Sequence, residues 1–297
     1  MSSSGHWIHD LDPKLIHLWG DLGVSYYGLS YVMGFVVGVA LHRLFRKTGR
    51  SPLTAAQEEI ALYAMVLGVL LGARLGYIIL YALPDTLRDP LFVFQVWKGG
   101  MSSHGGFFGV LIACWYVSRK CGITLVRFGD MMTPLVPVGF LLGRIANFIN
   151  GELWGKVSDV SWAVIFPRSA PGMALDMIPP RHPSQLYEAA LEGLVLLLYM
   201  QWRFWRTGAQ KHPGRMSGEF LILYSVFRIV CEHFREPDAS LIFGLSRGVF
   251  YSFFLILGGL YLIWRSHRIP EITLAPAPVQ AAAASGGGRK EKKGGGK

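Results

Sequence analysis

The sequence Gly-Arg-Ile-Ala-Asn-Phe-Ile-Asn-Gly-Glu-Leu-Trp-Gly, residues 143–155, follows directly on an apolar run from Met131 to Leu142. It places a cation, two amides and a carboxylate where a hydrocarbon-soluble helix is expected to reach the membrane surface. Ionisable groups are costly at such a position, so they are candidates for function. Arg144 and Asn147 are three residues apart and share one face of a helix. A guanidinium beside amides suits a phosphate; the alternative is a helix-end cluster that reaches the interface and caps the chain.

The composition indicates a membrane protein. Of the 297 residues, 52% are hydrophobic and only 16% are charged, and the mean hydropathy is +0.36. This is more apolar than an ordinary soluble domain. The net charge of +10 comes from basic residues in short loops and at the end of the chain, which is typical of cytoplasmic loops facing anionic lipid rather than of nucleic-acid binding. The spacing of the cysteines supports neither a disulfide framework nor a zinc site: Cys114, Cys121 and Cys231.

Seven apolar runs approach the length of about 20 residues that a helix needs to cross a bilayer. The third is marginal, and the runs lie at 25–45, 58–82, 105–120, 129–149, 185–202, 217–234 and 246–264. We therefore predict an all-α polytopic membrane protein with about seven transmembrane helices. Basic residues follow the first, third and fifth runs, which predicts that these loops and the C-terminus are cytoplasmic and that the N-terminus is periplasmic.

The chain is predicted to form a transmembrane domain over residues 1–270 and a tail over residues 271–297. Residues 151–184 are the longest outward loop and are rich in Pro and Gly, so we expect a small periplasmic cap there. The tail is mostly Ala, Gly and Lys and offers nothing to build a core. We predict that it is disordered, basic and cytoplasmic.

Two polar positions interrupt the first two apolar runs. Tyr27 opens the first run on the outward side, where an interfacial aromatic belt is the favoured interpretation and a ligand contact the alternative. Arg74 lies between Gly72 and Gly76 in the second run. Small neighbours allow another helix to approach closely, so Arg74 is either a structural partner for that helix or a ligand for substrate.

A single histidine, His104, precedes the third run among glycines. Flanking glycines allow a ligand to approach the backbone, and histidine exchanges protons near neutral pH. The residue is a candidate base, although a histidine at a helix start also serves as a hydrogen-bonded cap.

Polar side chains in the sixth run share one helix face. Tyr224, Arg228 and Glu232 are spaced by four residues, and Arg235 lies one turn beyond. A polar stripe in a lipid-embedded helix has to face protein or a wet cavity. The alternative is an Arg228–Glu232 pair that only neutralises itself. The stretch before the fifth run, residues 181–188, is interpreted as mainly architectural, with Ser184 as a helix cap and Tyr187 as an interfacial anchor.

These motifs together resemble the prolipoprotein diacylglyceryl transferase family of bacterial inner-membrane enzymes. Residues 143–155 match its signature, Gly-Arg-x-x-Asn-Phe-x-Asn-x-Glu-x-x-Gly, at every fixed position. Three further blocks resemble family blocks in the same order: HGG at 104–106, RHPSQLYE at 181–188 and FREPD at 234–238. The likeness extends from Tyr27 to about Arg265 and leaves out the tail and residues 156–180.

The resemblance implies transfer of the diacylglyceryl group of phosphatidylglycerol to the thiol of a lipobox cysteine, with release of glycerol phosphate. It implies that Arg144 holds the head group and that Arg228 is the second cation on the leaving phosphate, where arginines stabilise growing negative charge. His104 is then the candidate base for the thiol, which is only partly ionised at neutral pH. Asn147, Asn150 and Glu152 orient the head group or the arginines. The remaining positions implied for substrate binding are Tyr27, Gly155, Tyr224 and Glu232.

The expected partners are phosphatidylglycerol, the signal peptide of a prolipoprotein with its lipobox cysteine, and the bilayer of the bacterial inner membrane. We expect no cofactor, no metal and no nucleic acid. The competing class is an anion channel or a transporter of lipid head groups, because arginines in a helix bundle also serve anions. Intramembrane proteolysis is disfavoured, since the sequence contains no His-Glu-x-x-His and Asp130 has no second membrane aspartate.

Overall fold

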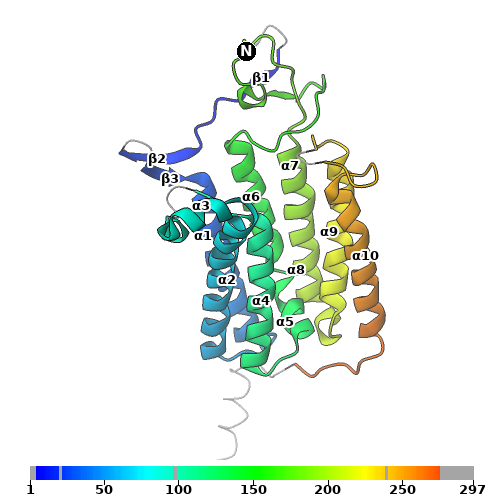
Figure 1. Ribbon diagram of the computed structural model, residues 1–297. Coiled ribbons are helices and arrows are strands. Elements are labelled where there is room, and N and C mark those ends of the chain that lie inside the picture. The colour runs from blue at the N-terminus through cyan, green and yellow to red at the C-terminus, as the bar shows by residue number, and fades with distance from the viewer. Residues whose placement is uncertain (1–4, 20–21, 96–98, 238–239, 275–297) are drawn as a thin grey trace, which may run out of the picture. The chain divides into compact units, whose positions relative to one another are not determined.

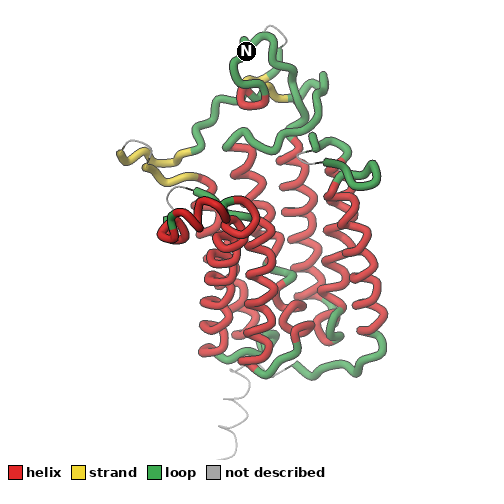
Figure 2. The backbone as a smooth tube through the Cα atoms, viewed as in Figure 1, coloured by secondary structure: helices red, strands yellow, loops and turns green. Residues whose placement is uncertain are grey.

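The computed structural model describes residues 5–19, 22–95, 99–237 and 240–274 (Figures 1 and 2). Contacts divide the chain into two compact units. The large unit contains the described parts of Met1–Leu41 and Asp130–Ile272, and the small unit contains His42–Gly129. Most of the predicted disordered tail, residues 275–297, lies outside the described residues.

Every predicted apolar run is helical in the described chain. The helices that correspond to these runs are α1 (Tyr26–Lys47), α2 (Ala55–Tyr81), α4 (Ser103–Cys121), α5 (Leu125–Met132) with α6 (Val136–Ile149), the continuous segment α7 (Ser184–Glu188), η4 (Ala189–Val195) and α8 (Leu196–Arg206), α9 (Arg215–Glu232) and α10 (Arg247–Ser266). Short helices lie between them: α3 (Leu83–Arg88), η1 (Pro90–Phe94), η3 (Pro167–Ser169) and η5 (Ala209–Lys211).

The described residues contain three helices that are long and apolar enough to cross a membrane, α1, α2 and α10. A fourth crossing results if the bent pair α4 and α5 is one span. The chain is therefore a multi-pass membrane protein, with fewer spans by this measure than the seven predicted. The predicted run 129–149 breaks between Met132 and Val136, which leaves α6 with 14 residues. Helix α9 carries charges along its length, at Arg215, Glu219, Arg228 and Glu232.

The prediction of an all-α chain misses two small sheets. An antiparallel hairpin, β2 (Lys14–Trp19) with β3 (Leu22–Ser25), comes immediately before α1. Strand β1 (Trp7–Ile8) pairs in parallel with β4 (Val164–Ile165), which ties the N-terminal segment to the segment after α6 (Figure 2). Strands of two residues carry no detectable sequence period, so this pairing was not visible in the pattern.

The small unit is built on a close contact between α2 and α4. A Cβ atom on Gly72 would lie 2.5 Å from the carbonyl oxygen of Gly105, and one on Gly68 would lie 2.6 Å from that of Gly109. Only glycine allows two helix backbones to approach this closely. The predicted close approach of a helix to the glycines beside Arg74 is confirmed.

In the large unit, α6, the α7–η4–α8 segment, α9 and α10 run side by side (Figure 1). The start of α9 is fixed by Asp130, whose carboxylate accepts hydrogen bonds from the amide of Gly214 at 2.6 Å and from Ser217. These bonds satisfy amides that a helix start leaves unpaired. The polar face of α9 is thereby held against its neighbours.

The segment from Gly151 to Pro183 connects α6 to α7 and corresponds to the predicted cap. Its backbone is tied together by bonds such as that from the Gly155 amide to the carbonyl of His182, at 2.9 Å. The prediction that Ser184 caps the following helix is wrong, because Pro183 occupies the N-cap position without a side-chain bond. Ser184 instead donates its hydroxyl to the carbonyl of Leu153, which joins the helix start to the end of the signature.

Candidate functional site

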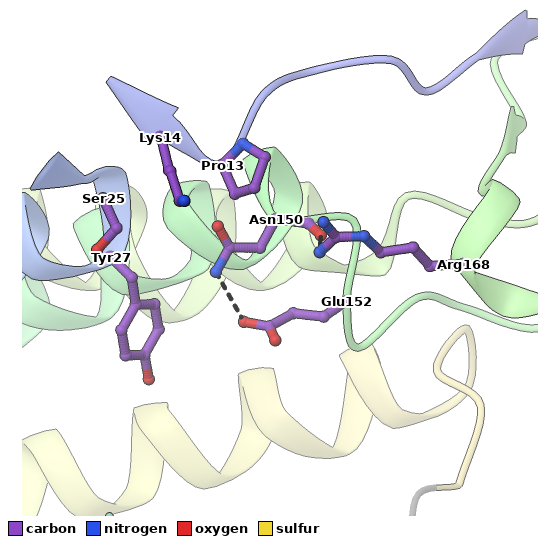
Figure 3. A pocket seen from close by; sticks show the side chains of 7 residues that line it. All are labelled: Pro13, Lys14, Ser25, Tyr27, Asn150, Glu152 and Arg168. Atoms are coloured by element: carbon purple, nitrogen blue, oxygen red, sulfur yellow. Dashed lines mark hydrogen bonds between the residues drawn. The ribbon is translucent and has the colours of Figure 1, made fainter. Parts of the chain in front are cut away.

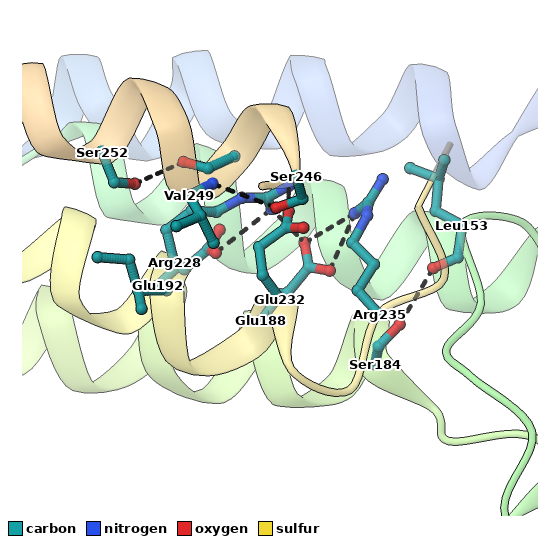
Figure 4. A network of polar contacts seen from close by, with 12 residues as sticks. Leu153, Ser184, Glu188, Glu192, Arg228, Glu232, Arg235, Ser246, Val249 and Ser252 are labelled. Atoms are coloured by element: carbon teal, nitrogen blue, oxygen red, sulfur yellow. Dashed lines mark hydrogen bonds and ion pairs between the residues drawn. The ribbon is translucent and has the colours of Figure 1, made fainter. Parts of the chain in front are cut away.

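A fully buried carboxylate, Glu188, is shared by three arginines in the large unit. Arg144 approaches its Oε2 at 2.7 Å, and Arg228 approaches the same oxygen at 3.1 Å. Arg235 donates to Oε1 at 2.9 Å. Figure 4 shows that the arginines of α9 and of the loop after it converge on Glu188. These contacts bring together residues that lie up to 91 positions apart in the sequence, since Arg144 and Arg235 bind the same group.

Two further carboxylates complete this ion network. Glu192 lies 3.5 Å from Arg228 and 3.8 Å from Arg144, and Glu232 accepts a hydrogen bond from Arg228. The formal charges of the six side chains balance: Arg144, Arg228 and Arg235 against Glu188, Glu192 and Glu232. The predicted Arg228–Glu232 pair therefore exists, but it is one part of a larger network rather than a self-contained pair.

The local structure of the fifth run aims both glutamates at the arginines. Glu188 ends α7, and Glu192 lies in η4, a π-helix. Such wide turns are rare in proteins, and many of those that are found lie at functional sites. Gly193 in the same segment allows α6 to approach, since a Cβ there would lie 2.7 Å from the Cα of Leu141. This contact brings Arg144, one turn further along α6, within reach of Glu188.

The network is shielded from solvent. The Glu188 side chain is 0% exposed and that of Arg235 is 5% exposed, whereas Arg144 is the most accessible at 21%. Charges in such surroundings are stable only when they are paired. The three arginines are therefore pre-aimed at one place, and Arg144 is the one that a ligand reaches most easily.

The amides and the carboxylate of the signature form a second cluster. Asn147 donates to Oε1 of Glu152 at 2.7 Å, and Asn150 donates to the same oxygen at 3.3 Å. Asn147 is buried, and Asn150 is the C-cap residue of α6. Arg144 is paired inside the unit, so the alternative of a cluster that only extends to the interface does not describe it.

Tyr27 lies beside this second cluster. Together with Asn150 and Glu152 it lines a pocket of about 440 Å³ beside the C-terminal end of α6 (Figure 3). Tyr27 is therefore next to the signature, and 39% of its surface is exposed. Tyr224 lies one turn before Arg228 on α9, where its ring stacks on Phe140 at 5.1 Å.

Two glycines allow the backbone to pass close to the network. A Cβ on Gly155 would lie 2.5 Å from the carbonyl oxygen of Phe234 and 2.6 Å from that of His182. Close packing therefore requires the glycine that ends the signature. Gly248, in the first turn of α10, has no room for a Cβ, because that atom would contact Glu232 and lie 2.8 Å from Nε of Arg228.

His104 belongs to the small unit and is exposed in the first turn of α4. The alternative that it caps this helix is wrong, because Ser102 is the N-cap residue and accepts from the amide of Gly105. No described residue forms a hydrogen bond with His104. Its predicted role as a base stays a prediction.

Arg74 in the small unit is buried and fully engaged by backbone. Its guanidinium donates to the carbonyls of Gly99 at 2.7 Å, Gly100 at 3.0 Å and Val93 at 3.0 Å, and also to that of Phe92. Of the two interpretations, the structural one therefore fits the contacts. Arg74 fixes the loop that leads to His104.

The chain was compared with known proteins. The family described as prolipoprotein diacylglyceryl transferase matches residues 13–265. The chain belongs to this family. The family resemblance stated from the signature is confirmed.

Among its relatives is a protein of Pseudoalteromonas atlantica named phosphatidylglycerol–prolipoprotein diacylglyceryl transferase, 42% identical over 277 residues, which cover 90% of this chain and 94% of the relative. Proteins of the same name from Vibrio atlanticus and Rhizobium leguminosarum are each 43% identical, over 87% and 89% of this chain and 92% and 95% of the relatives.

Sequence analysis missed several members of this ion network. Glu188 was assigned to an architectural block, Glu192 was not singled out, and Arg235 was noted beyond the polar stripe but given no role in the site. A signal was present, because Glu188 and Glu192 are two acids spaced by four residues inside an apolar run. Such a pair is as costly in a membrane as the arginines and calls for a cationic partner.

Proposed function

We propose that this protein transfers the diacylglyceryl group of phosphatidylglycerol to the cysteine thiol of a prolipoprotein lipobox, with release of glycerol phosphate. The observation that carries the proposal is the convergence of Arg144, Arg228 and Arg235 on Glu188 directly beside the family signature. The names of the relatives supply the reaction. The geometry supplies a reason why these residues suit it.

The reaction forms a bond between the cysteine sulfur and the glyceryl carbon and breaks the bond from that carbon to the phosphodiester oxygen. The electron pair of the broken bond leaves with glycerol phosphate, so negative charge grows on the phosphate. We propose that Arg144 and Arg228 bind this phosphate, because guanidinium groups offer paired donors to its oxygens. Arg144 is the entry cation, since it is the most accessible of the three. Glu188 holds both arginines in place.

The thiol proton has to leave before or during the attack, because the thiolate is the nucleophile. We propose His104 as the base that receives it. Its exposed ring in the first turn of α4 supports this assignment. Asn147, Asn150 and Glu152 orient the glycerol of the head group, and the proposal extends the same substrate-binding role to further residues: Tyr27, Gly155, Tyr224 and Glu232.

We further propose that the chain crosses the bacterial inner membrane seven times, with residues 1–270 as the transmembrane domain, residues 151–184 as a periplasmic cap and residues 271–297 as a cytoplasmic tail. The distribution of Lys and Arg between alternate loops supports this orientation. A fluorescent protein fused to the C-terminus is then bright, and alkaline phosphatase fused there is inactive. The opposite result would mean that the predicted number of spans is wrong by one or by another odd number.

The test of the activity uses the purified protein in liposomes. Labelled phosphatidylglycerol is supplied with a lipobox peptide, and a peptide with Ser in place of the lipobox Cys is the control. We expect one diacylglyceryl thioether for each glycerol phosphate released, and no product with the Ser peptide. Hydrolysis of lipid without a thioether, or anion flux without transfer, would contradict the proposal and favour a hydrolase or a channel.

A further inference from the structure

The pocket beside the signature is lined by residues other than those of the ion network. It is lined by residues from the N-terminal segment, the start of α1, the end of α6 and η3: Pro13, Lys14, Ser25, Tyr27, Asn150, Glu152 and Arg168. All of these belong to the large unit. Figure 3 shows Asn150 between the two cations, Lys14 and Arg168, with Glu152 next to it.

Hydrogen-bond acceptors that line the pocket are on Glu152 and Asn150. Oε1 of Glu152 accepts from two asparagine amides. The side-chain oxygen of Asn150 is buried and accepts no hydrogen bond in the part of the chain that the structure describes. An acceptor that is buried and left unpaired in this way is destabilising. A ligand that donates hydroxyl hydrogens would remove this destabilisation.

The cations that line the pocket are Lys14 and Arg168. Arg168 donates to the backbone oxygen of Asn150 at 2.6 Å, which orients its guanidinium while other N–H donors remain for a ligand. The Lys14 ammonium points toward the Asn150 side chain in Figure 3, from a different direction than Arg168. Two cations placed around one pocket suit a phosphate group.

We propose that this pocket binds glycerol phosphate, the water-soluble product, before it is released. The inference rests on the proposed function, which defines that product. The hydroxyl groups of glycerol donate to Asn150 and Glu152, and the phosphate lies between Lys14 and Arg168. The pocket size of about 440 Å³ is within the range of small-molecule sites, roughly 300–1,000 Å³.

The charge of the ligand separates this pocket from the ion network. The phosphodiester of phosphatidylglycerol carries a single negative charge, whereas a phosphate monoester such as glycerol phosphate carries up to two near neutral pH. The arginines of the network are balanced by Glu188, Glu192 and Glu232. Lys14 and Arg168 are two further cations that line the pocket and match the additional negative charge that the product acquires. Glu152 connects the two places, because it binds Asn147, one turn after Arg144.

The test measures equilibrium binding of labelled glycerol phosphate to the purified full chain in detergent, and inhibition of transfer by the same compound. We expect saturable binding that inorganic phosphate displaces. The double variant Lys14→Gln/Arg168→Gln is expected to weaken the binding and raise the inhibition constant at least tenfold. Arg168→Lys, which keeps the charge and loses the planar fork, is expected to give an intermediate value.

The matched control is Lys156→Gln, which removes an exposed cation of the same connecting segment that does not line the pocket. It is expected to bind glycerol phosphate as the parent does. Thermal unfolding of each variant checks that the chain is folded, and Lys14→Gln alone replaces the double variant if that one is unfolded. An active parent without saturable binding, or a folded double variant with unchanged binding and inhibition, would overturn the inference. Saturable binding by a chain that transfers nothing would refute the proposed function and leave the pocket assignment standing.

Discussion

Replacing Glu188 with Gln is the sharpest test of the ion network, because it changes one atom and one charge. Oε2 of Glu188 serves Arg144 and Arg228, and Oε1 serves Arg235. The amide nitrogen of the introduced Gln is a donor, and in place of either carboxylate oxygen it faces a guanidinium that also donates. When the nitrogen faces Arg235, only one charge-assisted hydrogen bond is lost, which is worth about 1.5–3 kcal/mol.

The lost charge adds to this cost, because breaking a buried ion pair by removing one partner costs about 3–5 kcal/mol. Since Gln retains the shape and one acceptor, we take the lower end, about 3 kcal/mol. At about 2–4 °C per kcal/mol for a large domain, the apparent Tm falls by about 6–12 °C. We also expect kcat/KM to fall about 100-fold, equivalent to about 2.7 kcal/mol, because Arg144 and Arg228 are no longer held in one arrangement.

The matched control is Glu219→Gln. Glu219 lies on α9 and, like Glu188, is a largely buried carboxylate that binds more than one arginine: Arg203 at 2.6 Å and Arg215 at 3.0 Å. This variant is expected to lose a similar amount of stability but to retain activity at temperatures where it is folded. The measurements are thermal unfolding in detergent and initial transfer rates at varied phosphatidylglycerol concentration. A folded Glu188→Gln protein with kcat/KM near that of the parent would refute the reasoning.

Three further changes test other parts of the molecule. Arg144→Lys keeps the charge but loses the planar fork, so we expect at least a tenfold loss of kcat/KM in correctly inserted protein; normal turnover would remove Arg144 from the phosphate site. Gly248→Ala introduces a Cβ against Glu232, and we expect a lower kcat with little change in protein yield, whereas unchanged kinetics would show that α10 yields freely. Burial lowers the pKa of His9 below its ordinary value of 6.5, so the folded state favours the neutral ring and loses stability as the pH falls below about 6.5. After division by the intrinsic, base-catalysed exchange rates, the amide protection factors around β1 should therefore be lower at about pH 5.5 than at pH 7.5, and His9→Gln should abolish this difference; an equal change in protection in the variant would exclude His9 as its cause.

The positions of the helices follow from local sequence and were predictable. Continuous apolar runs of about 20 residues form helices in a membrane, because a helix satisfies all its backbone hydrogen bonds within one segment. The glycines around Arg74 likewise predict a close contact with another helix, and α4 forms that contact. The break at 133–135 was missed, because the run 129–149 remains apolar through Pro134 and Pro137 and hydropathy alone does not register the turn.

The candidate site was predictable only in part. Arg144, Asn147 and Glu152 stand out because they are polar residues in an apolar setting and match a signature. Their partners depend on distances between elements that one sequence does not contain. Glu188 and Arg235 are 47 residues apart and meet only after α7 and the loop beyond α9 are packed. The pairing of β1 with β4 is hidden for the same reason.

In the proposed seven-span arrangement, the ion pairs between α7–η4–α8 and α9 also bear on how the chain enters the membrane. Each unpaired charge near the middle of a helix costs about 2.5–3.5 kcal/mol to insert, and α9 carries Arg228 and Glu232 while the preceding segment carries Glu188 and Glu192. Neither segment is well suited to enter lipid by itself. Side by side, Arg228 offsets only one of their three glutamates, and Arg144 and Arg235 offset the other two, so the two helices are best inserted together and beside α6. The contacts that arrange the site thus also favour a particular order of membrane insertion, in which the fifth hydrophobic segment enters the lipid only when the sixth has been synthesised.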